Sequence, residues 1–266
     1  MPVQDLFDLS HRRAVVTGGA RGLGAWIARA LAEAGAEVIV TSRSSETREK
    51  IETLADERGL SIRAISGRVD TEDGCREIAE QISDRWDGID ILVNNAGENN
   101  SYDALETYAY DIWSRSFSTN ATSVFEMTRL MLPLLGARAS EESPGRVIVI
   151  GSIDGARPSD LSSFAYGASK AASHLIGRAL AKHLVRQHIN VNTLTLGMFR
   201  TSMLVEAIPQ IRSQIGLTLR PDDATPVGAV GGYADIAGAI LMLAGPTGRY
   251  ITGESITIDG GLTTLR

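Results

Sequence analysis

Tyr166 and Lys170 form the pair of residues whose chemistry is clearest from the sequence. They stand four positions apart in the run Tyr166-Gly167-Ala168-Ser169-Lys170, near the start of a helical pattern, so their side chains lie one turn apart on one helix face. A free tyrosine has a pKa of about 10, and a nearby ammonium group favours the phenolate. The pair therefore predicts a tyrosine that gives and takes a proton near neutral pH. The same spacing also occurs by chance on surface helices, so other residues must decide.

Ser152 is the first of those other residues. It stands fourteen positions before Tyr166 and follows the apolar run Val147–Ile150 through Gly151. Ligand-binding groups of α/β sheets lie at this end of a strand. A hydroxyl group there would hold a substrate carbonyl beside the Tyr166 phenol, which indicates an enzyme acting on a carbonyl or alcohol group of a small molecule.

A glycine-rich turn near the N-terminus supplies a separate signal. The run Val15–Thr17 leads into Gly18, Gly22 and Gly24, which open a helical pattern. Glycines at such a turn let the backbone approach a pyrophosphate held at the helix N-terminus. A simple tight turn would use the same glycines, but their position after the first expected strand favours a dinucleotide site.

The end of the second expected strand indicates which dinucleotide binds. It reads Thr41-Ser42-Arg43 and lacks the carboxylate that NAD sites usually place there for the ribose hydroxyls. Arg43, together with Arg21 of the glycine turn, would bracket a 2′-phosphate with charge-assisted hydrogen bonds. This pattern predicts NADP(H). The alternative is that both arginines are solvated surface residues.

Short β-branched runs alternate with longer amphipathic segments, which predicts a doubly wound α/β fold with a parallel sheet and right-handed crossovers. Strands are expected at Arg13–Thr17, Glu37–Thr41, Ser61–Ile65, Ile89–Val93, Arg146–Ile150, Asn190–Leu196 and Ser255–Ile258. Helices are expected at Leu23–Ala34, Ser45–Asp56, Thr71–Trp86, Asp111–Leu135, Ser163–His188 and Tyr233–Ala244. We expect Thr71 and Ser45 to cap helix N-termini, and Gly35 and Gly59 to end helices.

Two stretches interrupt this alternation. We expect Arg138–Gly145 to form a solvated surface loop and Met198–Val230, which contains three prolines, to form a lid. Neither a repeat nor a linker divides the sequence. Residues 1–266 are therefore expected to form a single dinucleotide-binding and catalytic domain.

The bulk composition argues against several other classes of protein. Hydrophobic residues make up 43% of the 266 residues and charged residues 22%, as in soluble globular domains. A net charge of −6 disfavours nucleic acid and anionic membranes as partners. One cysteine, Cys75, and four scattered histidines indicate a reducing compartment and no metal site. Because neither a signal peptide nor a long apolar run is evident, we expect a cytoplasmic protein.

Together these pieces resemble the short-chain dehydrogenase/reductase family, over essentially the whole chain from Leu6 onward. The matching motifs are Thr17-Gly18-x-x-x-Gly22-x-Gly24, Asn94-Asn95-Ala96-Gly97, Asn120, Ser152, Tyr166 with Lys170, Thr201, and Asp259-Gly260-Gly261. Within the family, the chain is most similar to 3-oxoacyl reductases of the rhamnolipid-biosynthesis type, notably in the spacing from Ser152 to Tyr166 and in the run Leu132-Pro133-Leu134-Leu135. The resemblance implies a Rossmann fold, a homotetramer, and hydride transfer between NADP(H) and a carbonyl carbon.

The resemblance also assigns roles to single residues. It implies that Asn120 holds a water linking Lys170 to solvent, that Lys170 also binds the nicotinamide ribose, and that Thr201 binds the carboxamide. The expected catalytic residues are Asn120, Ser152, Tyr166 and Lys170. The expected cofactor contacts are Gly18, Arg21, Gly22, Leu23, Gly24, Ser42, Arg43, Val69, Asn95, Ala96, Gly97, Tyr166, Lys170, Gly197 and Thr201. The alternatives are that Asn120 is an ordinary helix residue and that Thr201 is an N-cap.

Two positions depart from the family pattern. Leu196-Gly197 stands where the family usually has Pro-Gly, a change that removes no reactive group. Arg68 takes the place of the aspartate that commonly contacts the adenine amino group. The sequence therefore does not predict which side chain binds the adenine amino group.

The expected lid suggests the class of substrate. Met198–Leu217 is rich in methionine and aliphatic residues, which favours a ketone with a bulky apolar arm such as a 3-oxoacyl chain; the same pattern would also arise from packing of a lid helix. The rival is a polyol or sugar-acid dehydrogenase, and a non-catalytic nucleotide sensor is disfavoured because it needs no proton donor. The expected substrate contacts are Ser152, Asp154, Tyr166, Met198 and Phe199, and the residues that would bind a polyol are Glu98, Asn99, Asn100 and Asp154.

Overall fold

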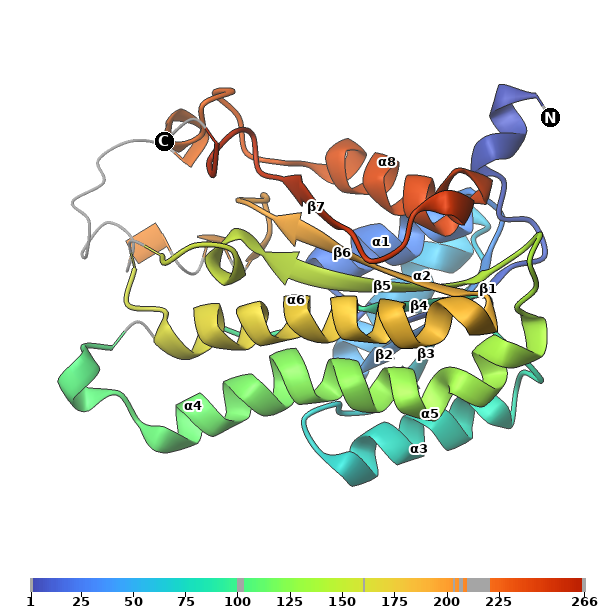
Figure 1. Ribbon diagram of the computed structural model, residues 1–266, viewed down its shortest axis with the longest axis horizontal. Coiled ribbons are helices and arrows are strands. Elements are labelled where there is room, and N and C mark those ends of the chain that lie inside the picture. The colour runs from blue at the N-terminus through green and yellow to red at the C-terminus, as the bar shows by residue number, and fades with distance from the viewer. Residues whose placement is uncertain are drawn as a thin grey trace.

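A seven-stranded parallel sheet forms the centre of the protein in the computed structural model, which describes residues 2–99, 103–159, 161–202, 204–205, 208–209 and 221–264. The strand order is β3-β2-β1-β4-β5-β6-β7 (Figure 1). The strands are β1 (Arg13–Val16), β2 (Glu37–Ser42), β3 (Ile62–Ser66), β4 (Ile91–Asn94), β5 (Gly145–Ser152), β6 (Ile189–Leu196) and β7 (Ser255–Ile258). The order reverses between β1 and β4, and ligands of doubly wound sheets bind at such a switch point.

Helices cover both faces of the sheet, so the fold is the doubly wound α/β arrangement that the sequence predicts (Figure 1). One face carries α1, α2 and α8, and the other carries α3, α5 and α6. The described helices are α1 (Gly22–Glu33), α2 (Ser45–Arg58), α3 (Glu72–Ser83), α4 (Tyr110–Phe117), α5 (Ser123–Arg138), α6 (Phe164–Leu184) and α8 (Tyr233–Ala244).

Strand β1 shows why the central strands are apolar throughout. Its successive side chains point to opposite faces: Ala14 and Val16 belong to the core beneath α1 and α8, whereas Val15 belongs to the core beneath α3, α5 and α6. All seven predicted strands are present, with each end within two residues of its predicted position. The apolar runs located the strands because both faces of this sheet are buried.

The helix ends confirm most of the predicted caps. Thr71 caps α3 through its side chain, and Gly35 and Gly59 follow α1 and α2 with left-handed φ angles of 101° and 66°. The prediction for α2 is wrong by one residue. Ser44 is the cap, since its Oγ accepts the backbone N–H three residues further on, and Ser45 is the first helical residue.

The helix predicted over Asp111–Leu135 is interrupted. A π-helical turn, Ser118–Thr122, joins α4 to α5. A π turn inserts a residue into the helical ladder, and such turns often occur at functional sites. Asn120 lies inside this turn and is 1% exposed. The pattern of apolar residues does not reveal the insertion, because the chain remains helical on both sides of it.

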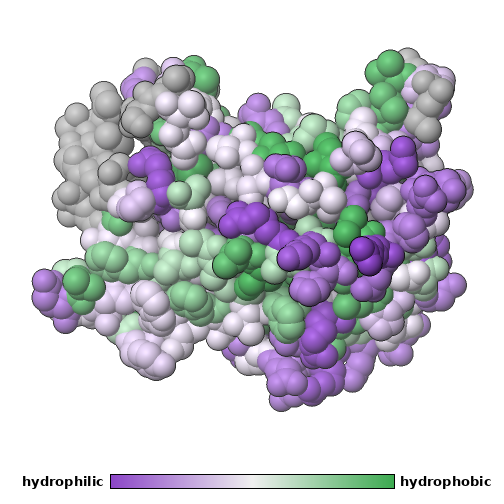
Figure 2. Space-filling model, in the orientation of Figure 1, coloured by the Kyte–Doolittle hydropathy of each residue, from purple (hydrophilic) through white to green (hydrophobic). Residues whose placement is uncertain are grey.

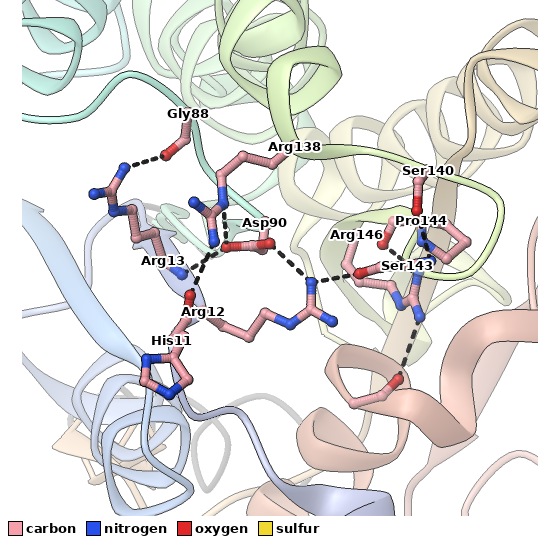
Figure 3. A network of polar contacts seen from close by, with 11 residues as sticks. His11, Arg12, Arg13, Gly88, Asp90, Arg138, Ser140, Ser143, Pro144 and Arg146 are labelled. Carbon is pink, nitrogen blue, oxygen red and sulfur yellow. Dashed lines mark hydrogen bonds and ion pairs between the residues drawn. The ribbon is translucent and has the colours of Figure 1, made fainter.

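Asp90 is the centre of a polar network at the amino ends of the strands, the edge of the sheet away from the switch-point loops (Figure 3). Its carboxylate lies 2.9 Å from both Arg12 Nη1 and Arg138 Nε, and it accepts the backbone N–H of Arg13 at 2.8 Å. The Asp90 side chain is 5% exposed. The expected surface loop Arg138–Gly145 is therefore solvated only in part, since its first residue is tied to the strand ends.

The face formed by α4, α5 and α6 carries a band of apolar and weakly polar side chains (Figure 2). Phe125 on α5, and Phe164 and Leu175 on α6, are exposed large apolar residues of these helices. Apolar surface of this kind often marks a protein contact, and the expected homo-oligomer stays a prediction. Among the described helices, none is long and apolar enough to cross a bilayer.

Candidate active site

Four of the predicted site residues lie at the carboxyl ends of neighbouring strands. Gly18 follows β1, Asn95 follows β4, Ser152 ends β5 and Gly197 follows β6. Carboxyl ends of parallel strands meet at one edge of a sheet, where α/β proteins bind their ligands. The fold thus brings together residues that lie far apart in the sequence.

The glycine turn between β1 and α1 fits the approach of an anionic group. A Cβ at Gly24 would lie 2.4 Å from Gly18 O and 2.5 Å from Asn95 Nδ2, so only glycine fits there. Arg21 is the N-cap of α1 and makes no side-chain capping bond. The first backbone N–H groups of α1 are therefore not capped by a side chain, as in helix termini that bind phosphate.

Thr17 and Asn95 hold the loops after β1 and β4 together. Thr17 Oγ1 accepts from the backbone N–H of Asn95 and of Ala96, each at 3.0 Å. Asn95 Nδ2 donates in return to Thr17 O at 2.8 Å and to Gly18 O at 3.1 Å. These bonds fix the crevice between the two loops at the switch point.

Arg43 and Arg21 both lie exposed beside this crevice, at the end of β2 and in the glycine turn. Arg48 also lies here, although no sequence motif points to it, and its Nη1 donates to Ser42 O at 2.9 Å. The α2 helix turns back at Ser44, and this turn brings Arg48 close to the end of β2. A third cation therefore stands at the position where an NAD site has a carboxylate.

Arg68 does not stand alone at the expected adenine position. Its guanidinium donates to both carboxylate oxygens of Asp70, at 2.9 and 2.7 Å. The hydrogen bond from Arg68 lowers the pKa of Asp70, and the charge of Arg43 lowers it further. Val69, between the paired residues, is buried and its carbonyl accepts from the Cys75 thiol at 3.3 Å. This end of the crevice is thus an arginine–carboxylate pair, not a lone arginine.

Tyr166 and Lys170 lie in the first turns of α6, as predicted. The Lys170 ammonium nitrogen is 5.8 Å from the centre of the Tyr166 ring and donates to Ile150 O at 2.7 Å. The side chain is buried, and burial lowers the pKa of Lys170 to about 8. The hydrogen bond fixes the start of α6 against the end of β5, which carries Ser152.

Asn120 joins the loop after β4 to α6. Its Oδ1 accepts from Glu98 N at 2.9 Å, and its Nδ2 donates to Glu98 O and to Ser169 Oγ, each at 3.0 Å. A Cβ at Gly97 would lie 3.3 Å from both Asn120 Oδ1 and Lys170 Nζ. These three residues therefore converge, and Ser169, which the sequence analysis did not single out, holds the π turn onto α6.

Ser152 ends β5 and is 8% exposed. Its Oγ accepts from Asp154 N at 3.2 Å, and its backbone N–H donates to His174 Nε2 at 3.3 Å. The Asp154 carboxylate accepts in turn from Ser163 Oγ at 3.4 Å. No sequence motif points to His174, although its position four residues after Lys170 on the same helix face is a signal that could have identified it.

Two residues at the start of the expected lid are held against the loop before α8. Phe199 is 4% exposed and belongs to the core beneath α1 and α8, where it packs against Gly231. The expected contact of Phe199 with the substrate stays a prediction. Met198 bonds through its carbonyl to Gly231 N, and Thr201 O accepts from Val205 N at the start of a helical turn.

Part of the sequence analysis falls on residues outside the described ranges. Asn100 is one of them. The lid residues Met203, Ile211, Ile215 and Leu217 are others.

Comparison with known proteins identifies the class to which this fold and site belong. The family model described as enoyl-(acyl carrier protein) reductase matches residues 18–263. The chain therefore belongs to the short-chain dehydrogenase/reductase family, as its motifs predict, and is an oxidoreductase.

Individual relatives cover nearly the whole chain. The rhamnolipids biosynthesis 3-oxoacyl-[acyl-carrier-protein] reductase of Pseudomonas aeruginosa is 41% identical, over 96% of this chain and 97% of the relative. A galactitol 2-dehydrogenase of Rhizobium johnstonii is 33% identical over 99% of both. A solved Pseudomonas aeruginosa RhlG/NADP active-site complex superposes with a TM-score of 0.89, at 39% identity, over 97% of this chain and 98% of that one.

Proposed function

We propose that this protein reduces a ketone to a secondary alcohol with NADPH. The observation that carries the proposal is the bond of 2.7 Å between Lys170 Nζ and Ile150 O, which holds the Tyr166 helix against the strand that ends in Ser152. This bond connects the helix that carries the Tyr166 phenol and the Lys170 ammonium group to the strand that ends at the Ser152 hydroxyl. When bound, NADPH supplies the hydride that adds to the carbonyl carbon.

The residues of this chain orient the carbonyl and handle the proton. Ser152 Oγ donates a hydrogen bond to the substrate oxygen and orients it. The Tyr166 hydroxyl gives its proton to that oxygen as the carbonyl carbon gains the hydride, so the product is a neutral alcohol. The Lys170 ammonium stabilises the phenolate that remains, and a proton from solvent restores the phenol. Asn120, whose amide binds the backbone of Glu98, keeps the loop after β4 against Lys170.

NADP(H) is the cofactor that the described residues fit. Gly24 lets α1 pack closely against Gly18 O and Asn95 Nδ2, and a Cβ at Gly22 would meet no atom within 4 Å, so the backbone of the turn at Gly22 is open to a pyrophosphate. Arg43 and Arg21 supply positive charge for a 2′-phosphate. A relative at 39% identity is solved as an NADP complex, which supports the same choice.

For the substrate, we infer a 3-oxoacyl chain or another ketone with a bulky apolar arm. The relative with 41% identity is a 3-oxoacyl-[acyl-carrier-protein] reductase, and Met198–Leu217 is rich in apolar residues. The second candidate is a polyol or sugar acid, favoured by the galactitol 2-dehydrogenase at 33% identity. Glu98 Oε1 lies 3.2 Å from Arg115 Nε but is buried and accepts no hydrogen bond among the described residues, so it keeps an acceptor for a substrate hydroxyl group.

A chain-length series separates the two candidates. We would measure kcat/KM with NADPH for 3-oxoacyl thioesters of increasing length beside 5-keto sugar acids, with Tyr166→Phe as the blank for turnover at this site. We expect kcat/KM to rise with chain length and to exceed that for the sugar acids. A flat response to length, combined with efficient reduction of sugar acids, would replace the 3-oxoacyl proposal with the polyol one.

A further inference from the structure

We propose that His174 is a positioning residue for Ser152, holding the backbone of that residue so that its hydroxyl meets the substrate carbonyl. The inference rests on the proposed function, because it takes Ser152 as the group that orients the carbonyl. None of the motifs that define the family includes His174. It lies in α6, one turn after Lys170.

The geometry at the end of β5 carries the inference. Strand β4 ends at Asn94, which pairs with Val149, so β5 extends past its neighbour by the residues 150–152. Two backbone groups in this extension bond to side chains of α6. Lys170 Nζ donates to Ile150 O at 2.7 Å, and His174 Nε2 accepts from Ser152 N at 3.3 Å.

Lys170 and His174 therefore lie on one face of α6 and both bond to the backbone at the end of β5. Residues four apart on a helix lie one above the other, and here they meet backbone groups two residues apart on β5. The first contact positions the ammonium group beside Tyr166. The second holds the residue that carries the Ser152 hydroxyl.

Close packing makes the His174 contact specific. A Cβ at Gly151 would lie 2.2 Å from His174 Nε2 and 2.9 Å from Thr193 Cγ2. The imidazole therefore lies directly against the β5 backbone, in space that only glycine leaves open. With Ser152 Oγ accepting from Asp154 N at 3.2 Å, the Ser152 backbone and side chain are each held by one hydrogen bond.

The protonation state of His174 suits an acceptor. Nε2 accepts a hydrogen bond only when it carries no proton, and the ring is 5% exposed. Burial, followed by the charges of Lys170 and Arg178, lowers the pKa of His174 to about 4. The imidazole therefore keeps its acceptor throughout the neutral range.

Two substitutions at His174 test the inference in the full-length enzyme. In His174→Gln the amide oxygen takes the place of Nε2, whereas His174→Leu has a similar volume and no acceptor. We expect His174→Leu to lower kcat for the ketone by about tenfold or more, where each factor of ten corresponds to ~1.4 kcal/mol of barrier. We expect His174→Gln to retain most of the wild-type kcat. Affinity for NADPH, measured by fluorescence titration, should be unchanged in both. His183→Leu, at an exposed position of the same helix, is the matched control.

A double-mutant cycle with Ser152→Ala separates positioning from general damage. If His174 acts through Ser152, adding His174→Leu to Ser152→Ala produces no further loss of kcat. An equal loss in both backgrounds would overturn the inference. If His174→Leu does not fold, His174→Asn, whose amide is too short to reach Ser152 N, takes its place in the comparison with His174→Gln.

The same set of variants distinguishes the two levels of the proposal. A wild-type enzyme that reduces no ketone with NADPH would refute the proposed function itself. Full activity of Ser152→Ala would refute the role of Ser152 and, with it, that of His174. Loss of activity in Ser152→Ala, with wild-type kcat in His174→Leu, would refute only the role of His174.

Discussion

Lys170 and Tyr166 occupy successive turns of α6, with the ammonium nitrogen 5.8 Å from the centre of the phenol ring. The lysine is 4% exposed, and burial brings its pKa to about 8. Its charge is therefore present at neutral pH and is lost within the mildly alkaline range. The positive charge that would stabilise the Tyr166 phenolate therefore depends on pH.

Tyr166→Phe should abolish most of the turnover while leaving the site intact. The ring remains, but the transferable proton does not, and general acid catalysis contributes about 10²–10⁴-fold. We expect kcat for ketone reduction to fall by that factor, with the dissociation constant of NADPH unchanged. A fall in kcat of only two- or threefold would remove Tyr166 from the mechanism.

The pH dependence of the wild-type enzyme should report on Lys170. We expect kcat/KM for NADPH to decline above about pH 8, because kcat/KM follows the ionisation of the free enzyme and Lys170 loses its proton there. In Lys170→Arg, whose guanidinium stays charged, this alkaline decline should disappear from any residual activity. A profile that stays flat to pH 10 in the wild type would contradict the assignment.

The ionisation of Lys170 does not by itself destabilise the fold over the pH range of that decline. The pKa of Lys170 is about 8 in the folded protein and has its ordinary value of 10.5 in the unfolded chain. Between these two pH values, the unfolded chain therefore binds more protons at this residue than the native state does. Stability therefore rises with pH through this window as far as Lys170 is concerned. Thermal unfolding measured at the same pH values checks that the enzyme remains folded while its activity falls.

Arg43→Asp should move the coenzyme preference toward NADH. The change removes a partner of the 2′-phosphate and adds a carboxylate at the end of β2 that can accept from ribose hydroxyls. A charge-assisted hydrogen bond contributes about 1.5–3 kcal/mol, so the ratio of kcat/KM for NADPH over NADH should fall at least about tenfold. Arg186→Asp, an exposed arginine after α6, is the control for net charge. A wild-type enzyme that uses NADH as efficiently as NADPH would refute the argument.

Asp90→Asn should destabilise the fold without changing the chemistry of the site. The buried carboxylate binds Arg12 and Arg138 at 2.9 Å each, and charged hydrogen bonds contribute about 1.5–3 kcal/mol. We expect the free energy of unfolding in urea to drop by about that much, with kcat unchanged. Asp87→Asn is the matched control: its side chain is 91% exposed and pairs only with Arg13 among the described residues, so a much smaller loss is expected. Equal losses would show that burial of Asp90 is unimportant.

The sequence alone determined the layers of the fold and the chemical groups of the site. Strands buried on both faces must be apolar at every position, so β1 to β7 could be located from their composition. The spacing of Tyr166 and Lys170 fixed their shared helix face, since residues four apart always share one. The glycines after β1 could be interpreted in the same way, because their backbone conformations depend on local sequence.

Only the tertiary structure decided which groups touch across the switch point. Asn120 reaches Ser169 because a π turn rotates it inward, and periodicity does not record such an insertion. An apolar phenylalanine side chain suits a pocket wall and a core equally well from the sequence, and only the structure places Phe199 in the core. His174 contacts Ser152 only because β5 extends past β4 and α6 packs over that end. Such contacts depend on where strands end relative to one another, and strand register is set by the packing of the whole sheet.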